Sequence, residues 1–204
     1  MGFFDLFAPK SRREPDKIWL NENAKLDGLC GDIAACLKHK QPVFAVSFHL
    51  KPLEELAARL AQRSLRPSGP VREYPPSAGE LWSSPEPLLC LWPSTIRAFV
   101  PAPPSALPAH KLEALWIFAV EHDLSPERDR SLLDYAAALP GPSRTRFYGA
   151  LDDPLLKAVG ADRLGALLKS LGATEQKPIE SSLVSRQIAA AQARLAKARE
   201  RGES

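Results

Sequence analysis

The sequence has no long apolar run and few cysteines. None of its hydrophobic stretches approaches the roughly 18 residues that a membrane-spanning helix needs, which argues against an integral membrane protein. Cys30, Cys36 and Cys90 form no C-x-x-C pair. An odd number of cysteines without a secretory signal predicts reduced thiols in a cytoplasmic protein. The four histidines show no metal-ligand spacing among themselves or with the cysteines, so we predict no metal site.

The excess of positive over negative charge is also small. The formal net charge is only +3 and the isoelectric point is about 8.8. A dedicated nucleic-acid-binding domain is usually far more basic, so no nucleic-acid partner is predicted. The hydrophobic fraction of 45% and the charged fraction of 25% are ordinary for soluble globular proteins, which argues against wholesale disorder. With 204 residues, the chain accommodates one domain of ordinary size plus an extension.

Proline is the residue in excess. The chain has 20 prolines, and 11 of them lie between Pro67 and Pro108. Proline removes a backbone donor and disfavours the helical conformation of the residue before it. The stretch 67–108 is therefore predicted to form turns and short strands rather than a long helix.

The amino-terminal segment, residues 1–15, combines apolar and basic side chains. Its members are Phe3, Phe4, Leu6 and Phe7, followed by Lys10, Arg12 and Arg13. We predict that this segment contacts a membrane surface, and a frayed or docked terminus is the alternative. The apolar part is too short for a secretory signal, and Leu6 stands where N-myristoylation prefers Ser or Thr.

Residues 16–153 show alternating helix and strand patterns. The predicted elements, in chain order, are a helix over 24–40, a strand over 43–48, a helix that begins near Pro52, a strand over 115–120, a helix from Ser125 to Leu139 and a strand over 146–151. The strands are short apolar runs, typical of parallel strands that are buried on both faces. This order predicts an α/β fold with a mainly parallel sheet flanked by helices.

Residues 154–204 are predicted to form a helical extension. Short helices are expected over 155–159 and 162–171, with Gly172 as the carboxyl-terminal cap. The last helix, 181–201, carries apolar residues at a 4-3-4-3 spacing, namely Val184, Ile188, Ala191, Leu195 and Ala198. Such a seam packs against another helix. Because two heptads are too few to be stable alone in water, the partner is either the body of this protein or another chain.

Three blocks of sequence carry a further pattern. The first, 16–60, contains an E-x-A-K motif that begins at Glu22 and a Q-P-V turn at 41–43, preceded by Lys40. The second, 119–153, ends in R-F-Y-G-A-L-D-D. The third, 153–198, contains P-I-E-x-x-x-V-S-R-x-I-x-x-A-Q. In this order the blocks resemble the SecA preprotein translocase family, in which a glycine stands at the position of Lys40.

The residues that match SecA outside the first block are Arg146, Phe147, Tyr148, Gly160, Asp162, Arg163, Gly172, Pro178, Ile179, Glu180, Ser185, Arg186, Ile188, Ala191 and Gln192. The resemblance implies that residues 16–153 form an incomplete and degenerate version of the second RecA-like lobe, the helicase second lobe. It also implies that 154–204 resemble the start of the SecA helical scaffold. The proline-rich middle has no match.

The resemblance also shows which catalytic residues are missing. This class of motor neutralises phosphate charge with a P-loop lysine, Mg²⁺ and arginines of the second lobe. The sequence has no G-x-x-x-x-G-K-[ST] motif, and the family's G-R-G-T-D has no counterpart. Leu133, Tyr135 and Ala138 stand where the family has three arginines. Because loss of an arginine finger costs about 10³ to 10⁵ in rate, we predict no enzyme, no catalytic residue and no bound cofactor.

Neither of two other residue pairs is a good candidate for an enzyme active site. Ser47 and His49 share one face of a predicted strand, but no G-x-S-x-G turn accompanies them. Asp152 and Asp153 are adjacent, and adjacent strand residues face opposite ways, which makes them a poor acid and base pair.

The resemblance predicts a catalytically inactive bacterial SecA-like module that acts by protein binding and is linked to protein export. The expected partner is a SecA-type motor or a P-loop lobe, and the expected location is the cytoplasm or the inner face of the membrane. The alternative is one lobe of a split ATPase that a separate P-loop lobe completes. A decaying duplicate gene is a third hypothesis, since fold alone does not establish function.

Overall fold

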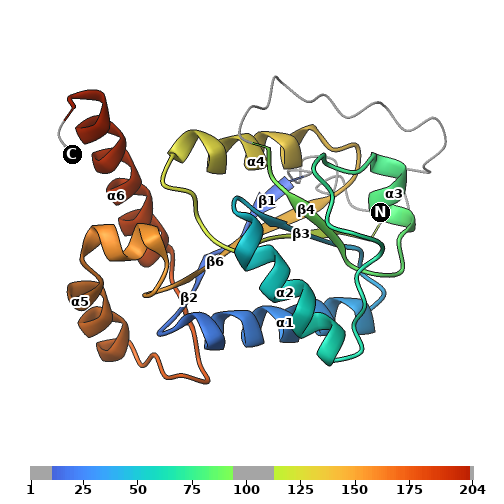
Figure 1. The fold of residues 1–204 in the computed structure, drawn as a ribbon, viewed down its shortest axis with the longest axis horizontal. Coiled ribbons are helices and arrows are strands. Elements are labelled where there is room, and N and C mark those ends of the chain that lie inside the picture. The colour runs from blue at the N-terminus through green and yellow to red at the C-terminus, as the bar shows by residue number, and fades with distance from the viewer. Residues whose placement is uncertain (1–10, 94–112, 203–204) are drawn as a thin grey trace, which may run out of the picture.

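The computed structural model describes residues 11–93 and 113–202, which form strands and helices in alternation (Figure 1). In chain order they are β1 (Ser11–Arg13), β2 (Lys17–Trp19), α1 (Glu22–Lys38), β3 (Val43–Ser47), α2 (Leu50–Gln62), α3 (Ala78–Ser83), β4 (Leu88–Leu91), β5 (Leu115–Ala119), α4 (Pro126–Ala138), β6 (Ser143–Ala150), α5 (Pro154–Ser170), β7 (Ile179–Glu180) and α6 (Ser182–Glu200). Phe3, Phe4, Leu6, Phe7 and Lys10, which we predicted to contact a membrane, lie outside the described residues.

All the strands belong to one sheet, in the order β4-β3-β5-β6-β2-β7, and β1 pairs with the first part of β6. Every pair is parallel except β2 with β7, which is antiparallel. The predicted α/β fold with a mainly parallel sheet flanked by helices is confirmed.

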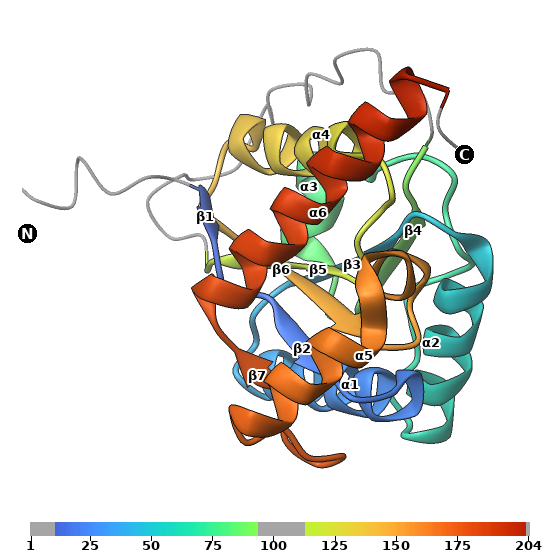
Figure 2. The same cartoon turned by 90° about the vertical axis from the view of Figure 1, so that its left-hand side faces the viewer.

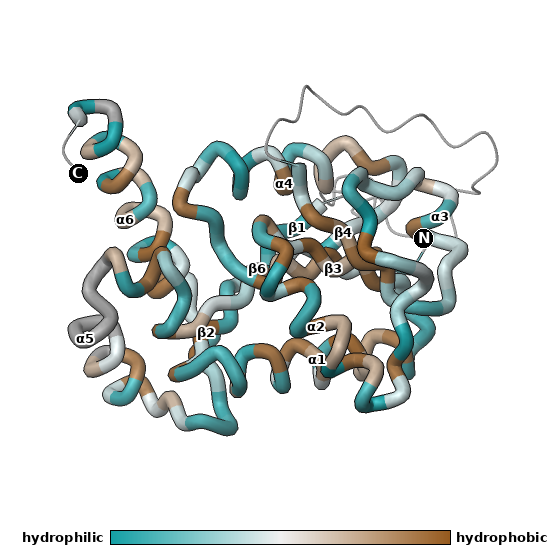
Figure 3. The backbone as a smooth tube through the Cα atoms, in the orientation of Figure 1, coloured by the Kyte–Doolittle hydropathy of each residue, from teal (hydrophilic) through white to brown (hydrophobic). Residues whose placement is uncertain are grey.

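The two faces of the sheet are covered by different helices. Along β3, β5 and β6, alternate side chains point to opposite faces, as strand geometry requires. Phe44, Ile117 and Phe147 pack with side chains of α3 and α4, while Phe118 and Tyr148 pack with those of α1 and α2. Figure 1 shows α1 and α2 on one side of the strands and α3 and α4 on the other. The hydropathy colouring of Figure 3 is most apolar along the central strands between these layers.

A third apolar cluster lies at the β2 end of the sheet. There Ile18 of β2 packs with Leu156 and Leu168 of α5 and with Val184 and Ile188 of α6. Figure 2 shows α5 and α6 in front of β2 and β6. The carboxyl-terminal helices therefore share a hydrophobic core with the edge of the sheet.

One predicted division of the chain into helices is wrong. The two short helices expected over 155–171 are one helix, α5, because the packing of its apolar side chains outweighs the low helix propensity of glycine. Gly172 does follow this helix with a left-handed φ of 89°, as predicted for a cap. The helix expected to begin near Pro52 begins at Leu50, in agreement with the prediction.

Four short elements were not predicted, namely β1, β2, β7 and α3. The helix α3 lies within the proline-rich stretch and begins with a capping box, in which Ser77 and Glu80 satisfy each other's backbone N–H groups. The same stretch contains the edge strand β4, in agreement with the prediction of turns and short strands.

Candidate functional site

Ligands of open parallel sheets bind beside the carboxyl ends of the strands. In this protein β3 is followed there by Phe48, β5 by Glu121 and Asp123, and β6 by Asp153. The three carboxyl groups are buried. The edge at which a nucleotide would be expected is therefore acidic.

Glu121 is held by the strand beside it. Its Oε1 accepts hydrogen bonds from Ser47 Oγ at 2.6 Å and from the backbone N–H of Phe48 at 2.7 Å. Burial raises the pKa of Glu121 to about 7, although these hydrogen bonds and Lys25 oppose the rise. Ser47 Oγ also lies 2.5 Å from the backbone oxygen of His49 and accepts from the backbone N–H of that residue. The Ser47 hydroxyl is thus bonded to Glu121 and to the backbone of His49, which does not support a nucleophile and base pair.

Lys25 and Asp153 form a buried ion pair beside this edge. Lys25 Nζ lies 2.6 Å from Asp153 Oδ1, and the lysine side chain is only 1% exposed. The other oxygen of Asp153 accepts from the backbone N–H of Ala150 at 2.9 Å. Asp152 has a separate role, since its carboxylate accepts from the backbone N–H of Glu22 at the start of α1. The lysine at the edge is fully engaged within the protein.

Arg128 of α4 is the guanidinium group at this edge. It lies 2.8 Å from a carboxylate oxygen of Asp123 and donates to the backbone oxygens of Trp92 at 2.8 Å and Phe48 at 3.4 Å. Its guanidinium carbon also lies 5.0 Å from the centre of the Phe48 ring. The two terminal nitrogens of Arg128 are thus bonded to a carboxylate and to two backbone oxygens of the protein itself.

The three positions at which SecA has arginines contribute apolar surface. Tyr135 is 3% exposed, lies edge-on to Trp92 with ring centres 5.2 Å apart, and donates its hydroxyl hydrogen to the backbone oxygen of Pro76. Leu133 packs against the same core, and Ala138 is exposed. These side chains offer no positive charge to a nucleotide.

A second polar cluster is centred on His122, which follows Glu121. Its ring stacks on Phe147 with centres 4.5 Å apart. Nδ1 lies 2.6 Å from an oxygen of Asp129, and Nε2 lies 3.2 Å from an oxygen of Asp16. Burial lowers the pKa of His122, but the two carboxylates outweigh it and raise that pKa to about 9. The charged imidazolium then donates to both carboxylates and links α4 to the segment between β1 and β2.

Hydrogen bonds of the same cluster also join α6 to the sheet. Gln192 Nε2 donates to the backbone oxygen of Asp123 at 2.7 Å and to Asp129 Oδ2 at 2.8 Å. Ser185 Oγ accepts from the backbone N–H of Asp16 at 3.1 Å. We call the set of Asp16, His122, Asp129, Ser185 and Gln192 the histidine clamp. Buried hydrogen bonds of this kind fix one arrangement of the elements they join.

The seam predicted on the last helix faces this protein's own body along part of its length. Val184, Ile188 and Ala191 are buried, while Leu195 and Ala198 are half-buried. Val184 and Ile188 pack in the cluster with β2 and α5. Of the two partners that the sequence left open, the structure therefore shows the body of the protein.

Arg12 and Arg13 are the members of the predicted membrane-contact set that the structure describes. Both lie on β1. Arg12 pairs with Glu14 at 3.3 Å, and Arg13 pairs with Asp16 at 3.3 Å and lies over the ring of Phe147. Each is partly exposed.

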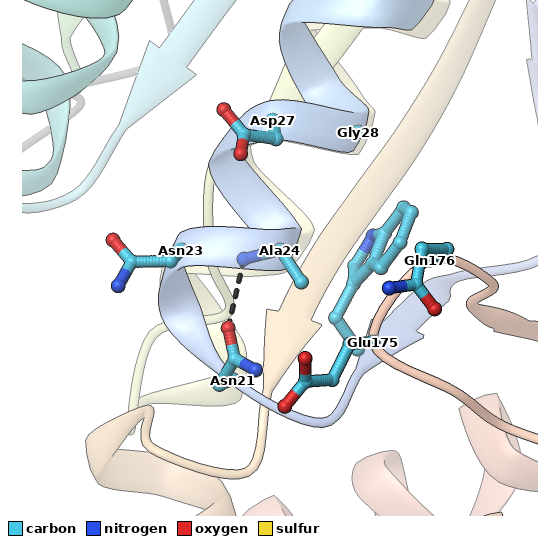
Figure 4. Close-up of a pocket in the computed structure, with 8 residues that line it drawn as sticks. Asn21, Asn23, Ala24, Asp27, Gly28, Glu175 and Gln176 are labelled. Atoms are coloured by element: carbon cyan, nitrogen blue, oxygen red, sulfur yellow. Dashed lines mark hydrogen bonds between the residues drawn. The ribbon is translucent and has the colours of Figure 1, made fainter.

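A pocket of about 610 Å³ lies at the start of α1 (Figure 4). Asn21, Asp27 and Gly28 line it from the chain around this helix, and Glu175 and Gln176 line it from the loop before β7. Two of the first N–H groups of α1 already have acceptors, because Asn21 accepts from Ala24 and Asp152 accepts from Glu22. Both acceptors compete with an anion at this helix start.

The described residues contain neither a metal-binding cluster nor a membrane-spanning helix. Within 11–93 and 113–202, no group of three or more His, Cys, Asp or Glu side chains could hold a metal ion. In the same residues, every helix is too short or too polar to cross a membrane.

The main polar residues of this region were not predicted as site residues from the sequence, namely Glu121, His122, Asp123, Arg128 and Gln192. A signal was present in the run of three polar residues, Glu121 to Asp123, directly after an apolar strand. Such residues lie at the carboxyl edge of a parallel sheet. Their partners Asp16 and Gln192 are 106 and 69 residues away in sequence, so spacing gave no indication of them.

No family model matches the chain. It is 38% identical over 85 residues to the protein translocase subunit SecA of Oleidesulfovibrio alaskensis, across 42% of this chain and 10% of that protein. It is 27% identical over 178 residues to SecA of Maridesulfovibrio salexigens, across 85% of this chain and 21% of that protein. It is 26% identical over 186 residues to SecA of Caldicellulosiruptor saccharolyticus, across 89% and 22%. The predicted resemblance to SecA is confirmed.

The chain spans 10% to 22% of the length of these relatives. Among solved structures, it is similar to the C-terminal domain of a candidate DNA helicase from Lactobacillus plantarum, with a TM-score of 0.39 and 14% identity. That match covers 65% of this chain and 71% of the helicase chain.

Proposed function

We propose that this SecA-like chain acts by binding protein, in a process related to protein translocation, and does not hydrolyse ATP. One observation carries the proposal, namely that the carboxyl edge of the sheet is acidic and that the cations beside it are paired with carboxylates of the protein itself. Lys25 and Arg128, the cations beside it, are committed to Asp153 and Asp123. A phosphate would have to displace one of these carboxylates from its partner.

The cost of such a displacement supports the proposal. Breaking a buried ion pair leaves an uncompensated charge and costs about 3 to 5 kcal/mol. Each 1.4 kcal/mol is a factor of ten in affinity, so nucleotide binding through Lys25 would be weakened by about 10² to 4 × 10³. A motor of this class depends on the opposite arrangement, in which cations are free to neutralise phosphate charge.

The alternative function is one lobe of a split ATPase. A P-loop lobe in another chain would then supply the Walker lysine and Mg²⁺, and this chain would supply arginines. Leu133, Tyr135 and Ala138 provide none at the matched positions. We therefore place protein binding first, and we propose a SecA-type motor as the partner, in the cytoplasm or at the inner face of the membrane.

The first experiment measures binding of a fluorescent ATP analogue, with and without Mg²⁺, up to about 1 mM nucleotide. The proposal expects no saturable binding and no phosphate release. The matched variant is Arg128→Ala, which removes the guanidinium group at the edge. Saturable, Mg²⁺-dependent binding that this variant loses would overturn the proposal and favour the split ATPase.

The second experiment measures association with the purified SecA motor of the same cell, by fluorescence anisotropy of the labelled chain. A saturable rise in anisotropy supports protein binding. If neither the motor nor a P-loop lobe binds, the proposed partner is wrong.

A further inference from the structure

A groove runs along the side of α6 that faces α4 and β1. It consists of two hollows of about 430 and 410 Å³, which both contain Arg13 and Ala189. The first hollow lies between α4 and α6, and the second lies between β1 and the start of α6. Figure 2 shows α6 passing β1 and then α4, so the two hollows follow one helix. We call this surface the α6 groove.

Small and apolar residues make up part of the lining of the α6 groove. Ala189, Ala193 and Ala196 line it from α6, and Pro126 and Leu133 line it from α4. The alanines occupy a different face of α6 from Val184 and Ile188, which are buried against α5 and β2. The alanines therefore leave room beside α6 for the side chains of another chain.

The rim of the α6 groove is positively charged. Arg130 and Lys197 lie along the first hollow and Arg186 along the second, and all three side chains are exposed. Within the part of the chain that the structure describes, none of the three lies within 4 Å of a carboxylate oxygen, although Arg130 is close enough to Glu127 to help lower the pKa of that carboxyl. Arg12 and Arg13 add two further guanidinium groups, each already paired with a carboxylate.

The carboxylates that face the groove are fewer and mostly engaged. Asp129 is buried and bonded to His122 and Gln192. Glu14 is buried and lies near Arg12 and Arg144. Glu127 is exposed and accepts from Ser125. The unpaired charge around the groove is therefore mainly positive.

We infer that the α6 groove binds an acidic segment of a partner protein. Carboxylates of the segment pair with Arg130, Arg186 and Lys197, and its small side chains lie against the alanines of α6. From Ser182 to Lys197 the helix extends about 22 Å, at 1.5 Å per residue. An extended segment of about seven residues spans that length. This inference rests on the proposed protein-binding function and adds the chemical class of the partner segment.

The shape of the surface favours a peptide over a lipid bilayer. A bilayer is flat, whereas this surface is hollow between two elements and is lined by both cations and small apolar residues. The walls are also fixed in advance, since Gln192 ties α6 to Asp123 and Asp129. A preformed groove spares the ordering cost of binding.

The test uses the full chain and three fluorescein-labelled peptides of eight residues, which alternate Glu, Gln or Lys with Ala. The protein variants are the triple charge reversal Arg130→Glu, Arg186→Glu and Lys197→Glu, and the single control Lys157→Glu. Lys157 is an exposed lysine on α5 that does not line the groove. Circular dichroism and a urea midpoint check that each variant is folded.

The wild-type chain and the Lys157→Glu control are expected to bind the Glu peptide with a Kd below about 1 mM. The Gln and Lys peptides should bind at least about tenfold more weakly, and the triple variant should lose at least about tenfold for the Glu peptide. Raising the salt concentration should weaken the interaction, because the charges are exposed.

Three results would overturn the inference. They are equal binding of the Glu and Lys peptides, equal binding by the wild type and the triple variant, and no binding of the Glu peptide up to 1 mM. A parallel measurement uses vesicles of phosphatidylglycerol and phosphatidylcholine. If only the vesicles lose binding in the triple variant, the surface belongs to a membrane and the inference is wrong. Nucleotide binding in the same proteins tests the proposed function separately, since the reversed residues lie outside the carboxyl edge.

Discussion

Protonation of His122 should control the stability of this protein between about pH 6.5 and 9. In the folded protein burial lowers the pKa of the imidazole, but Asp129 and Asp16 raise it to about 9, whereas an unfolded chain has a histidine pKa of 6.5. The folded state therefore binds the proton more tightly. The stabilisation is fully present below pH 6.5 and is lost as pH rises through 9.

The size of the effect follows from the two pKa values. Each pH unit between them removes up to about 1.4 kcal/mol from the free energy of unfolding, so the loss over the whole range is about 3 kcal/mol. Urea unfolding followed by tryptophan fluorescence, at pH 6.5, 7.5 and 8.5, measures it directly. The urea midpoint should fall at each step.

The matched variant is His122→Gln, which keeps hydrogen-bond donors and removes the positive charge. It should be less stable at pH 6.5 and change less with pH. Burial raises the pKa of Glu121 to about 7, and the stability linked to this raised pKa is lost as pH rises towards 7, in both proteins alike. The difference between the two proteins isolates His122. Parallel pH profiles would refute the assignment of a buried imidazolium.

Three further substitutions test other parts of the structure. Lys25→Met should cost about 3 to 5 kcal/mol of unfolding free energy, measured by urea midpoint, because it leaves a buried carboxylate unpaired. Gly28→Ala should cost about 1 to 3 kcal/mol, since a Cβ there would lie 2.0 Å from a ring carbon of Trp19, whereas the control Gly31→Ala, with open space, should stabilise α1 by about 0.5 to 1 kcal/mol. Tyr135→Arg, which restores an arginine of the SecA pattern, should lower the thermal midpoint and yield no phosphate release, because the site is buried; hydrolysis by this variant would contradict the proposed function.

Elements with a strong local pattern were predictable from the sequence. The strands β3 and β5 are continuous apolar runs, and α1 and α6 carry apolar residues at helical spacing. The short strands β1, β2 and β7 were not predictable, because each has only two or three residues and is defined by its partner. Strand β2 pairs with β6, more than a hundred residues further along the chain.

The helix α3 was predictable in principle. Prolines on both sides of it favoured a reading as turns, but S-A-G-E at 77–80 has the Ser and Glu spacing of a capping box. The histidine clamp could not be predicted from the sequence. His122 and Asp129 are seven residues apart, and Asp16 and Gln192 come from opposite ends of the chain. Only the fold brings these four side chains together.

The pairing of β6 affects the order in which strands enter the sheet as the chain is synthesised. Strands β1 and β2 both lie along β6, and β2 in turn carries β7. On the ribosome, residues 11–19 are made well before β6. They have no strand to pair with until β6 has emerged, some 130 residues later. Pairing over so long a separation is slow, because loop-closure entropy must be overcome first. The earliest part of the described chain is thus among the last to enter the sheet, and until then the edge of β6 stays open to any other strand that reaches it.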